Sequence, residues 1–164
     1  KKTYLRKMPK KTLFRRKREG KTDYNKRLNL LKYQKPRLVI RKSLNNVSIQ
    51  FIDYIPTGDK VLISTHSNQL KKLGWKSHKG NVSSAYLTGL IGGLKAKSKN
   101  IETAVLDLGL NPSIKGSVLY AALQGVLDAE LEVPHSKEVL PPKKKLEKQS
   151  EFKEIKEKIL KEKW

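Results

Sequence analysis

The sequence predicts an α/β fold in which helices cover a mixed sheet, with a basic arm before it and a helical tail after it. Residues 37–65 alternate apolar and polar side chains as strands do. Residues 82–94 and 117–131 repeat apolar side chains at helical spacing, with an apolar run between them. The order strand, helix, strand, helix is typical of a crossover unit that adds a parallel strand to the sheet.

The chain begins with a basic arm, residues 1–21, whose few apolar side chains show no periodicity. We therefore expect no core within this segment. A short basic helix should follow from Thr22 to Tyr33, because Thr22 can cap it and Asp23 suits the positive end of its dipole. Pro36 then ends the segment, since the residue before a proline disfavours helical geometry.

Three strands of an antiparallel meander come next. RLVIRK (37–42) is β-branched at its centre, VSIQFIDYI (47–55) alternates, and KVLIST (60–65) follows a Pro-Thr-Gly-Asp turn. One or two helical turns are expected over 67–74, ending at Gly74. These turns would pass the chain from the meander to the first long helix.

Two helices with small residues along one side follow, the first after Gly80-Asn81 and the second over 117–131. The small rows are Ala85, Gly89 and Gly93 in the first helix and Ala122, Gly125 and Ala129 in the second. Such rows let a helix approach its neighbour closely, which compensates for the ~1 kcal/mol that each glycine costs in a helix. Between the helices, TAVLDLG (103–109) predicts a strand buried on both faces.

The chain divides into a basic arm at 1–21, an α/β domain with its leading basic helix at 22–142, and a Lys/Glu tail at 143–164. A thin apolar stripe runs through the tail at Phe152, Ile155 and Ile159. This pattern predicts a docking or solvated helix that lies outside the core.

Positive charge is concentrated at the start of the chain. The net charge is +22, and residues 1–42 contribute 18 basic against 2 acidic side chains. A field of that density repels itself unless a polyanion lies against it, so nucleic acid is the leading partner and an anionic membrane the second. The membrane alternative lacks a strong amphipathic basic helix. No apolar run approaches the ~18–20 residues of a membrane span, and a soluble protein is expected.

Candidate catalytic residues are few. The chain has no Cys, and its three histidines lie far apart without a helical i, i+4 pair, so neither thiol chemistry nor a metal site is predicted. Asp107, at the end of a predicted strand, is the best catalytic candidate, although an acid there more often closes a turn or caps a helix. The alternative from another functional class is a metal-dependent nuclease with Asp53 and Asp107 as ligands.

The basic residues point more clearly to RNA. Cations at 15–18 and at Lys21 can reach phosphates on several sides of an extended chain, and arginine offers bidentate geometry. Tyr24, one turn from Arg27, can stack on a splayed base or a ribose. Arg37 and Arg41 are four residues apart in one strand and therefore share a face of the sheet.

Several separate segments carry a resemblance to a known family. They are RRKREGKTDYNKRLNLL (15–31), RLVIRKS (37–43), NVSSAYLTGLIGGLKAK (81–97), AVLDLGL (104–110) and VLYAALQGVLDAELEVPHS (118–136). Together they resemble the ribosomal protein L eighteen family of the large subunit, which binds 5S ribosomal RNA. The match runs over most of residues 10–140, and the arm and the tail are similar to those of archaeal members.

The resemblance implies a domain related in topology to the ribonuclease H fold but without catalysis. It implies a structural protein of the cytoplasmic ribosome that attaches 5S rRNA to the large-subunit rRNA in the central protuberance. The implied partners are these two RNAs and the neighbouring ribosomal proteins there, with no membrane, cofactor or metal. Carried over by motif, the RNA-binding residues are Arg15, Arg16, Lys17, Arg18, Lys21, Tyr24, Arg27, Arg37, Arg41, Ser43 and Asn45.

Overall fold

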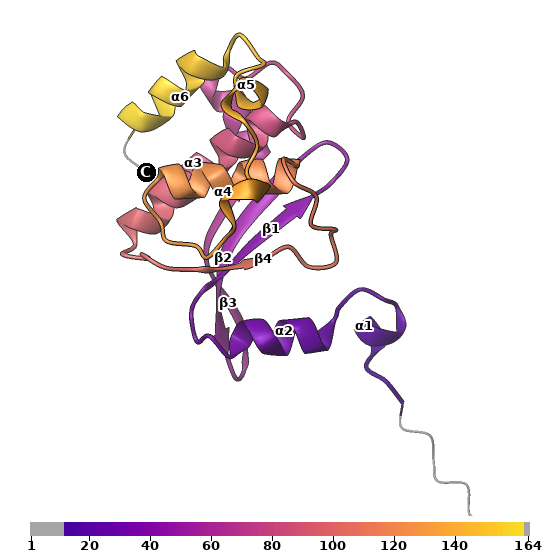
Figure 1. Cartoon of the computed structure of the whole chain (residues 1–164). Helices are drawn as coiled ribbons and strands as arrows, with labels where there is room; N and C mark the ends of the chain where they lie inside the picture. The colour runs from indigo at the N-terminus through magenta and orange to yellow at the C-terminus, as the bar shows by residue number, and fades with distance from the viewer. Residues whose placement is uncertain (1–11, 163–164) are drawn as a thin grey trace, which may run out of the picture.

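A four-stranded mixed sheet forms the centre of the protein (Figure 1). The computed structural model describes residues 12–162, so the first half of the expected arm, residues 1–11, lies outside the described part. The strand order is β3-β2-β1-β4. The strands are β1 (Arg37–Lys42), β2 (Val47–Ile55), β3 (Gly58–His66) and β4 (Val105–Asp107). Strands β1 to β3 pair antiparallel and β4 pairs parallel with β1, which confirms the mixed sheet. The ribonuclease H-like topology stays a prediction.

Strand β1 lies inside the sheet and has two different faces. Leu38 and Ile40 are fully buried, together with Ile49 and Phe51 of β2, because the helices cover this face. The opposite face carries Arg37 and Arg41, as the four-residue spacing predicted, beside half-buried polar side chains of β2. The sheet therefore has one apolar face and one charged face.

Strand β4 differs from the prediction. It has three residues, lies at the edge of the sheet and pairs only with β1, so a strand buried on both faces over 103–109 is wrong. The apolar residues of 103–109 are covered in another way. The chain around Glu132 runs alongside the residues before β4 and accepts a hydrogen bond from the Ala104 backbone N–H at 3.1 Å. Leu131 and Val133 are buried there, so apolar cover comes from a non-strand segment.

Helices α3 (Val82–Ser98) and α4 (Val118–Asp128) pack against each other on the apolar face of the sheet. Their backbones approach closely at the predicted small residues. A Cβ added at Gly89 would lie 2.1 Å from the Ala122 carbonyl oxygen, and one at Gly125 would lie 2.1 Å from the Tyr86 carbonyl oxygen. The predicted packing role of these glycines is confirmed, because no side chain fits at either position.

Smaller helical elements complete the chain. The predicted turns after β3 form a 3-10 helix, η1 (Ser67–Leu73), which ends at Gly74 with a left-handed φ of 97°, as expected. A second 3-10 turn, η2 (Lys137–Val139), leads towards the C-terminal segment. Residues 12–21 are all exposed, including those of a short helix, α1 (Arg15–Arg18), which buries no side chain.

The C-terminal segment is part of the core. Helices α5 (Lys143–Leu146) and α6 (Phe152–Lys161) pack beside α3, at the opposite end of the molecule from α1 and α2 (Figure 1). Phe152, Ile155 and Ile159 are 0–3% exposed and belong to the main hydrophobic cluster. The helix docks, but the expectation that it lies outside the core is wrong. Three large side chains are enough to dock α6, because the Tyr86 ring packs on Phe152 with the two ring centroids 5.4 Å apart.

None of the helices in residues 12–162 has the length and apolar character that crossing a membrane requires.

Replacing Gly89 by alanine tests the helix contact. We expect Gly89→Ala to lower the free energy of unfolding by about 2–3 kcal/mol, because the new methyl group meets backbone atoms that cannot rotate away. Gly92→Ala in the same helix is the matched control, since its nearest neighbour is the Thr65 side chain at 3.0 Å, and it should cost under ~1 kcal/mol. Urea unfolding measures both, and equal costs would contradict the packing argument.

Candidate nucleic-acid interface

Helix α2 (Tyr24–Leu31) begins the charged region of the domain. Its N-cap is Asp23, whose side chain accepts hydrogen bonds from the backbone N–H groups of Asn25 and Lys26. The prediction that Thr22 caps the helix is therefore wrong. The Thr22 hydroxyl instead accepts a 2.8 Å hydrogen bond from Arg16 Nε, which connects α1 to the start of α2. Asp23 takes the cap position because its carboxylate reaches two N–H groups of the first turn.

Polar contacts attach α2 to the rest of the protein. None of its eight residues is fully buried. Lys26 Nζ donates to the Gly109 carbonyl oxygen at 2.9 Å, and Arg27 Nη2 pairs with the Asp59 carboxylate at 2.8 Å. Gly109 lies in the loop after β4 and Asp59 at the start of β3, so α2 is bound at two separate places.

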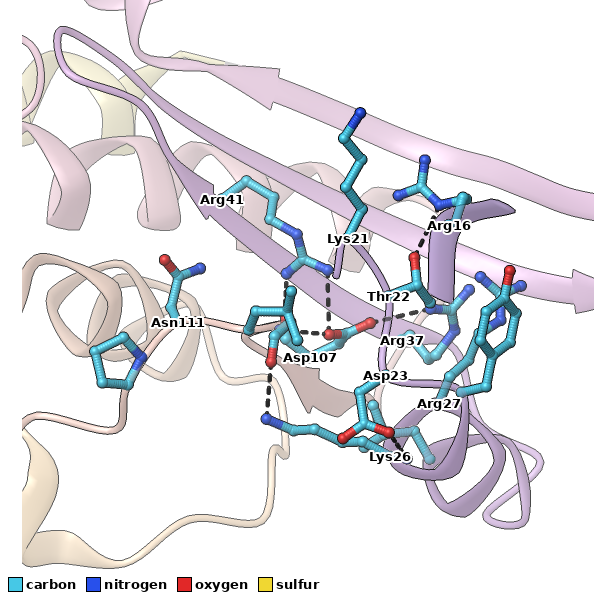
Figure 2. Close-up of a pocket in the computed structure, with 15 residues that line it drawn as sticks. Arg16, Lys21, Thr22, Asp23, Lys26, Arg27, Arg37, Arg41, Asp107 and Asn111 are labelled. Carbon is cyan, nitrogen blue, oxygen red and sulfur yellow. Dashed lines mark hydrogen bonds and ion pairs between the residues drawn. The ribbon is translucent and has the colours of Figure 1, made fainter. Parts of the chain in front are cut away.

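Arg37 is the most deeply buried of the predicted RNA contacts. Its side chain is 4% exposed, and it donates to Asp59 at 2.7 Å and to Asp107 at 3.0 Å. Asp107 also pairs with Arg41 at 3.2 Å and accepts a 2.8 Å hydrogen bond from the Gly109 backbone N–H (Figure 2). Asp107 thus acts as a turn acid and an arginine partner, which agrees with the structural alternative for this residue.

The pKa of Asp107 is lowered despite its burial. Loss of water would raise the pKa of this carboxyl, but the Arg41 charge, the Gly109 N–H and the Arg37 charge together outweigh that effect. Asp107 therefore stays ionised and holds two guanidinium groups in place. Arg41 is fixed further by a 2.7 Å hydrogen bond from Nη1 to the Asp107 carbonyl oxygen.

A hollow of about 490 Å³ opens on the charged face, between α2, β1 and the loop after β4. We call it the cationic hollow. Six of its lining residues are basic and two, Asp23 and Asp107, are acidic. The basic residues are Arg16, Lys21, Lys26, Arg27, Arg37 and Arg41. Figure 2 shows these side chains reaching the hollow from the arm, from α2 and from β1.

The hollow brings together six of the eleven predicted RNA-binding residues: Arg16, Lys21, Tyr24, Arg27, Arg37 and Arg41. Arg15, Lys17 and Arg18 lie outside it on α1, where they are exposed. Ser43 and Asn45 lie in the turn between β1 and β2 and do not line the hollow. Ser43 is bonded to Asn46 in that turn, and the Asn45 side chain contacts His78.

The family of the chain follows from a comparison with family models. Residues 9–101, more than half of the sequence, match the model described as "Ribosomal large subunit proteins 60S L5, and 50S L18". The chain belongs to this family. It is a ribosomal protein, and the family gives it a structural role in the large subunit of the cytoplasmic ribosome, with ribosomal RNA and ribosomal proteins as partners. The matched segment contains α1, α2, β1 and the connection between α1 and α2, and together these supply all the basic residues of the hollow.

Some residues of this ribosomal protein's charged site were not predicted from the sequence. Lys26 lines the hollow, and its position next to Arg27 on a basic helix was an available signal. Asn111 lines it from the loop after β4, and the rule that ligands bind at the carboxyl ends of parallel strands could have found it. Asp59 had no local signal, since its role depends on the pairing of β2 with β3.

The carboxylates of the nuclease alternative are engaged separately. Asp107 is bound to two arginines, whereas Asp53 lies on the exposed part of β2 and accepts a hydrogen bond from its own neighbour, Tyr54. Within residues 12–162, no three His, Cys, Asp or Glu side chains are grouped to hold a metal ion.

Replacing Asp107 tests its role in stability. We expect Asp107→Asn to lower the free energy of unfolding by roughly 3 kcal/mol near pH 7, because it leaves the buried Arg37 with one carboxylate instead of two. The folded-state pKa is depressed, so this stability is present above the unfolded pKa of about 4 and is lost as the pH falls through the folded value. Urea unfolding at pH 7 and at about pH 3 should show a smaller gap between the two proteins at the lower pH. A gap of the same size at both pH values would contradict the assignment.

Proposed function

We propose that the protein binds 5S rRNA and attaches it to the large-subunit rRNA in the central protuberance. The family supplies the setting, a structural protein of the large subunit. The observation that supports RNA binding by this face is the cationic hollow, with six basic side chains from the arm, α2 and β1. Such a surface fits phosphates, which supply most of the affinity of proteins for nucleic acids.

The basic residues differ in what they can offer to RNA. Lys21 and Arg27 have side chains that are 63% and 35% exposed, so they can contact phosphates directly. Arg41 is 42% exposed, but its two terminal nitrogens already donate to β1 and β4. Arg37 is buried between two carboxylates, and we propose that it shapes the site rather than touching RNA.

Helix α1 extends the charged surface beyond the hollow. Arg15, Lys17 and Arg18 are exposed there, and Gly20, with a positive φ of 62°, turns the chain between α1 and α2. RNA phosphates outside the hollow are the partners that these side chains fit. The part of the arm before residue 12 is proposed to continue this contact because it is also rich in Lys and Arg.

An aromatic pair lies beside the basic residues. The rings of Phe14 and Tyr24 are 5.4 Å apart, and Phe14 is 73% exposed. Exposed rings next to cations are the arrangement on which unpaired bases stack. Tyr24 is therefore retained in the proposed interface, and Phe14 is added to it. Ser43 and Asn45 remain proposed contacts on a separate part of the surface.

RNA binding should depend on salt in a way that identifies the surface. If α1 and the hollow neutralise ~6–8 phosphates, log Kd will rise steeply with log salt concentration, and replacing Arg16 and Arg18 by alanine should flatten that slope by roughly 1–2 units. Replacing Lys144 and Lys148 removes the same charge at the other end of the molecule and should leave the slope unchanged. Titration of labelled 5S rRNA over a salt series measures both. A slope left unchanged by the Arg16 and Arg18 replacements would place the RNA elsewhere.

The nuclease alternative is tested by direct assay. With Mg²⁺ or Mn²⁺ present, we expect neither RNA nor an RNA–DNA hybrid to be cut faster than in a mock preparation, because Asp107 is bound to two arginines and is not free to coordinate an ion. Gel electrophoresis of labelled substrates provides the measurement. Metal-dependent cleavage that disappears in Asp107→Asn would replace the proposed function with the nuclease.

A further inference from the structure

Five alternating charges connect the elements that form the charged face. In order they are Arg27, Asp59, Arg37, Asp107 and Arg41, with nitrogen–oxygen distances of 2.8, 2.7, 3.0 and 3.2 Å between successive members. They come from α2, β3, β1, β4 and again β1. Arg27 belongs to α2, which has no fully buried residue, whereas the other four charges lie on strands that do. The series therefore connects the weakly attached α2 to the sheet.

We propose that Asp59 is a positioning residue for RNA binding, so that this acidic side chain increases the affinity of the protein for a polyanion. It acts by holding Arg27, and with it α2, in the place where they meet RNA. The inference rests on the proposed function, because it concerns the same surface. The opposite alternative is that Asp59 masks Arg27 and competes with RNA for it.

The hydrogen bonds of Arg27 favour positioning over masking. Both of its bonds to Asp59 come from Nη2, one to each carboxylate oxygen, at 2.9 and 2.8 Å. Nε and Nη1 have no acceptor among residues 12–162, and the side chain lines the hollow with 35% of its surface exposed. A guanidinium has five N–H donors, so Arg27 can be held by Asp59 and still donate to a phosphate.

The weak attachment of α2 makes this contact important. Within the described residues 12–162, helix α2 has two long-range polar contacts, Arg27 with Asp59 and Lys26 with the Gly109 carbonyl oxygen. A single exposed lysine contact holds a helix poorly, because such contacts are worth about 1 kcal/mol or less. Without Asp59, the binding-competent position of α2 would be populated less, and the apparent affinity for RNA would fall with that population.

Asp59 itself is firmly held. It lies at the start of β3, opposite Tyr54 of β2, and its side chain is 26% exposed. It accepts the 2.7 Å hydrogen bond from the buried Arg37. Arg37 Nε is already buried without a partner, so this guanidinium depends on its two carboxylates. Asp59 is thus held by Arg37 on the side of the core, and it can hold Arg27 on the side of the solvent.

The direction in which one substitution changes the affinity for RNA separates the positioning role from the masking role. Removing any negative charge from a basic protein should strengthen binding to RNA through the overall field. We expect Asp59→Asn to weaken binding to labelled 5S rRNA instead, by roughly tenfold. The substitution removes the charge-assisted contact between Asp59 and Arg27 that holds Arg27 in place. Asp53→Asn on the same hairpin removes the same charge from a carboxylate whose bond is to its own neighbour, Tyr54, and should bind as tightly as the wild type or more tightly.

A second pair of variants excludes general damage to the fold. In the Arg27→Gln background, Asp59→Asn should no longer weaken binding, because the side chain that it positions is gone. Asp59→Glu should restore most of the affinity, since it keeps the charge. Unfolding midpoints recorded for every variant show how far each loss of binding follows a loss of stability.

The possible outcomes are distinct. Unchanged or tighter binding by Asp59→Asn, or a further loss of equal size in the Arg27→Gln background, would overturn the positioning role while leaving RNA binding intact. If the wild-type protein itself fails to bind 5S rRNA, the proposed function and the inference both fail. A tenfold loss that depends on Arg27 would establish Asp59 as part of the binding machinery.

Discussion

The buried charge of Arg37 is the constraint on which the charged face depends. A guanidinium that is 4% exposed must be compensated, because an isolated charge in the interior costs several kcal/mol. Compensation requires Asp59 from β3 and Asp107 from β4 at the same time, although β1 and β3 are separated by β2. The three-residue strand β4 is too short for its ladder alone to fix its position. The Arg37 and Arg41 bonds to Asp107 therefore help to place β4 and the loop that closes the cationic hollow.

The opposite face of the sheet satisfies a different requirement. There the backbones of α3 and α4 approach so closely that Gly89 and Gly125 have no room for a methyl group, and α3 packs directly on β2 and β3. Helix α6 adds Phe152 and Ile155 to the same cluster from the far side of α3. The apolar face thus provides a rigid support, and the charged face can present arginines without contributing most of the stability.

Within the charged face, the basic residues have two kinds of role. Arg37 and Arg41 donate to carboxylates and carbonyl groups of the sheet, so both terminal nitrogens of each side chain are engaged inside the protein. Arg16, Lys21 and Arg27 come from elements outside the sheet and keep exposed donors. In the proposed interface both kinds are used, since the inner arginines would give the outer ones a fixed surface on which to meet rRNA.

The sequence alone determined the elements whose signals are local. The alternation in 37–65 predicted the meander, and the small rows around Gly89 and Gly125 predicted the helix pair. The basic residues at 15–27, with Arg37 and Arg41, predicted most of the hollow's cations, because side-chain period and charge are properties of neighbouring residues. Other features depended on contacts between distant segments. The pairing of Asp59 with Arg27, the edge position of β4 and the burial of the C-terminal stripe are fixed only when strands, loops and tail pack together. The division of 1–21, 22–142 and 143–164 into separate parts stays a prediction. Burial and ion pairing at such sites are decided by tertiary structure, because each requires a partner from another part of the chain.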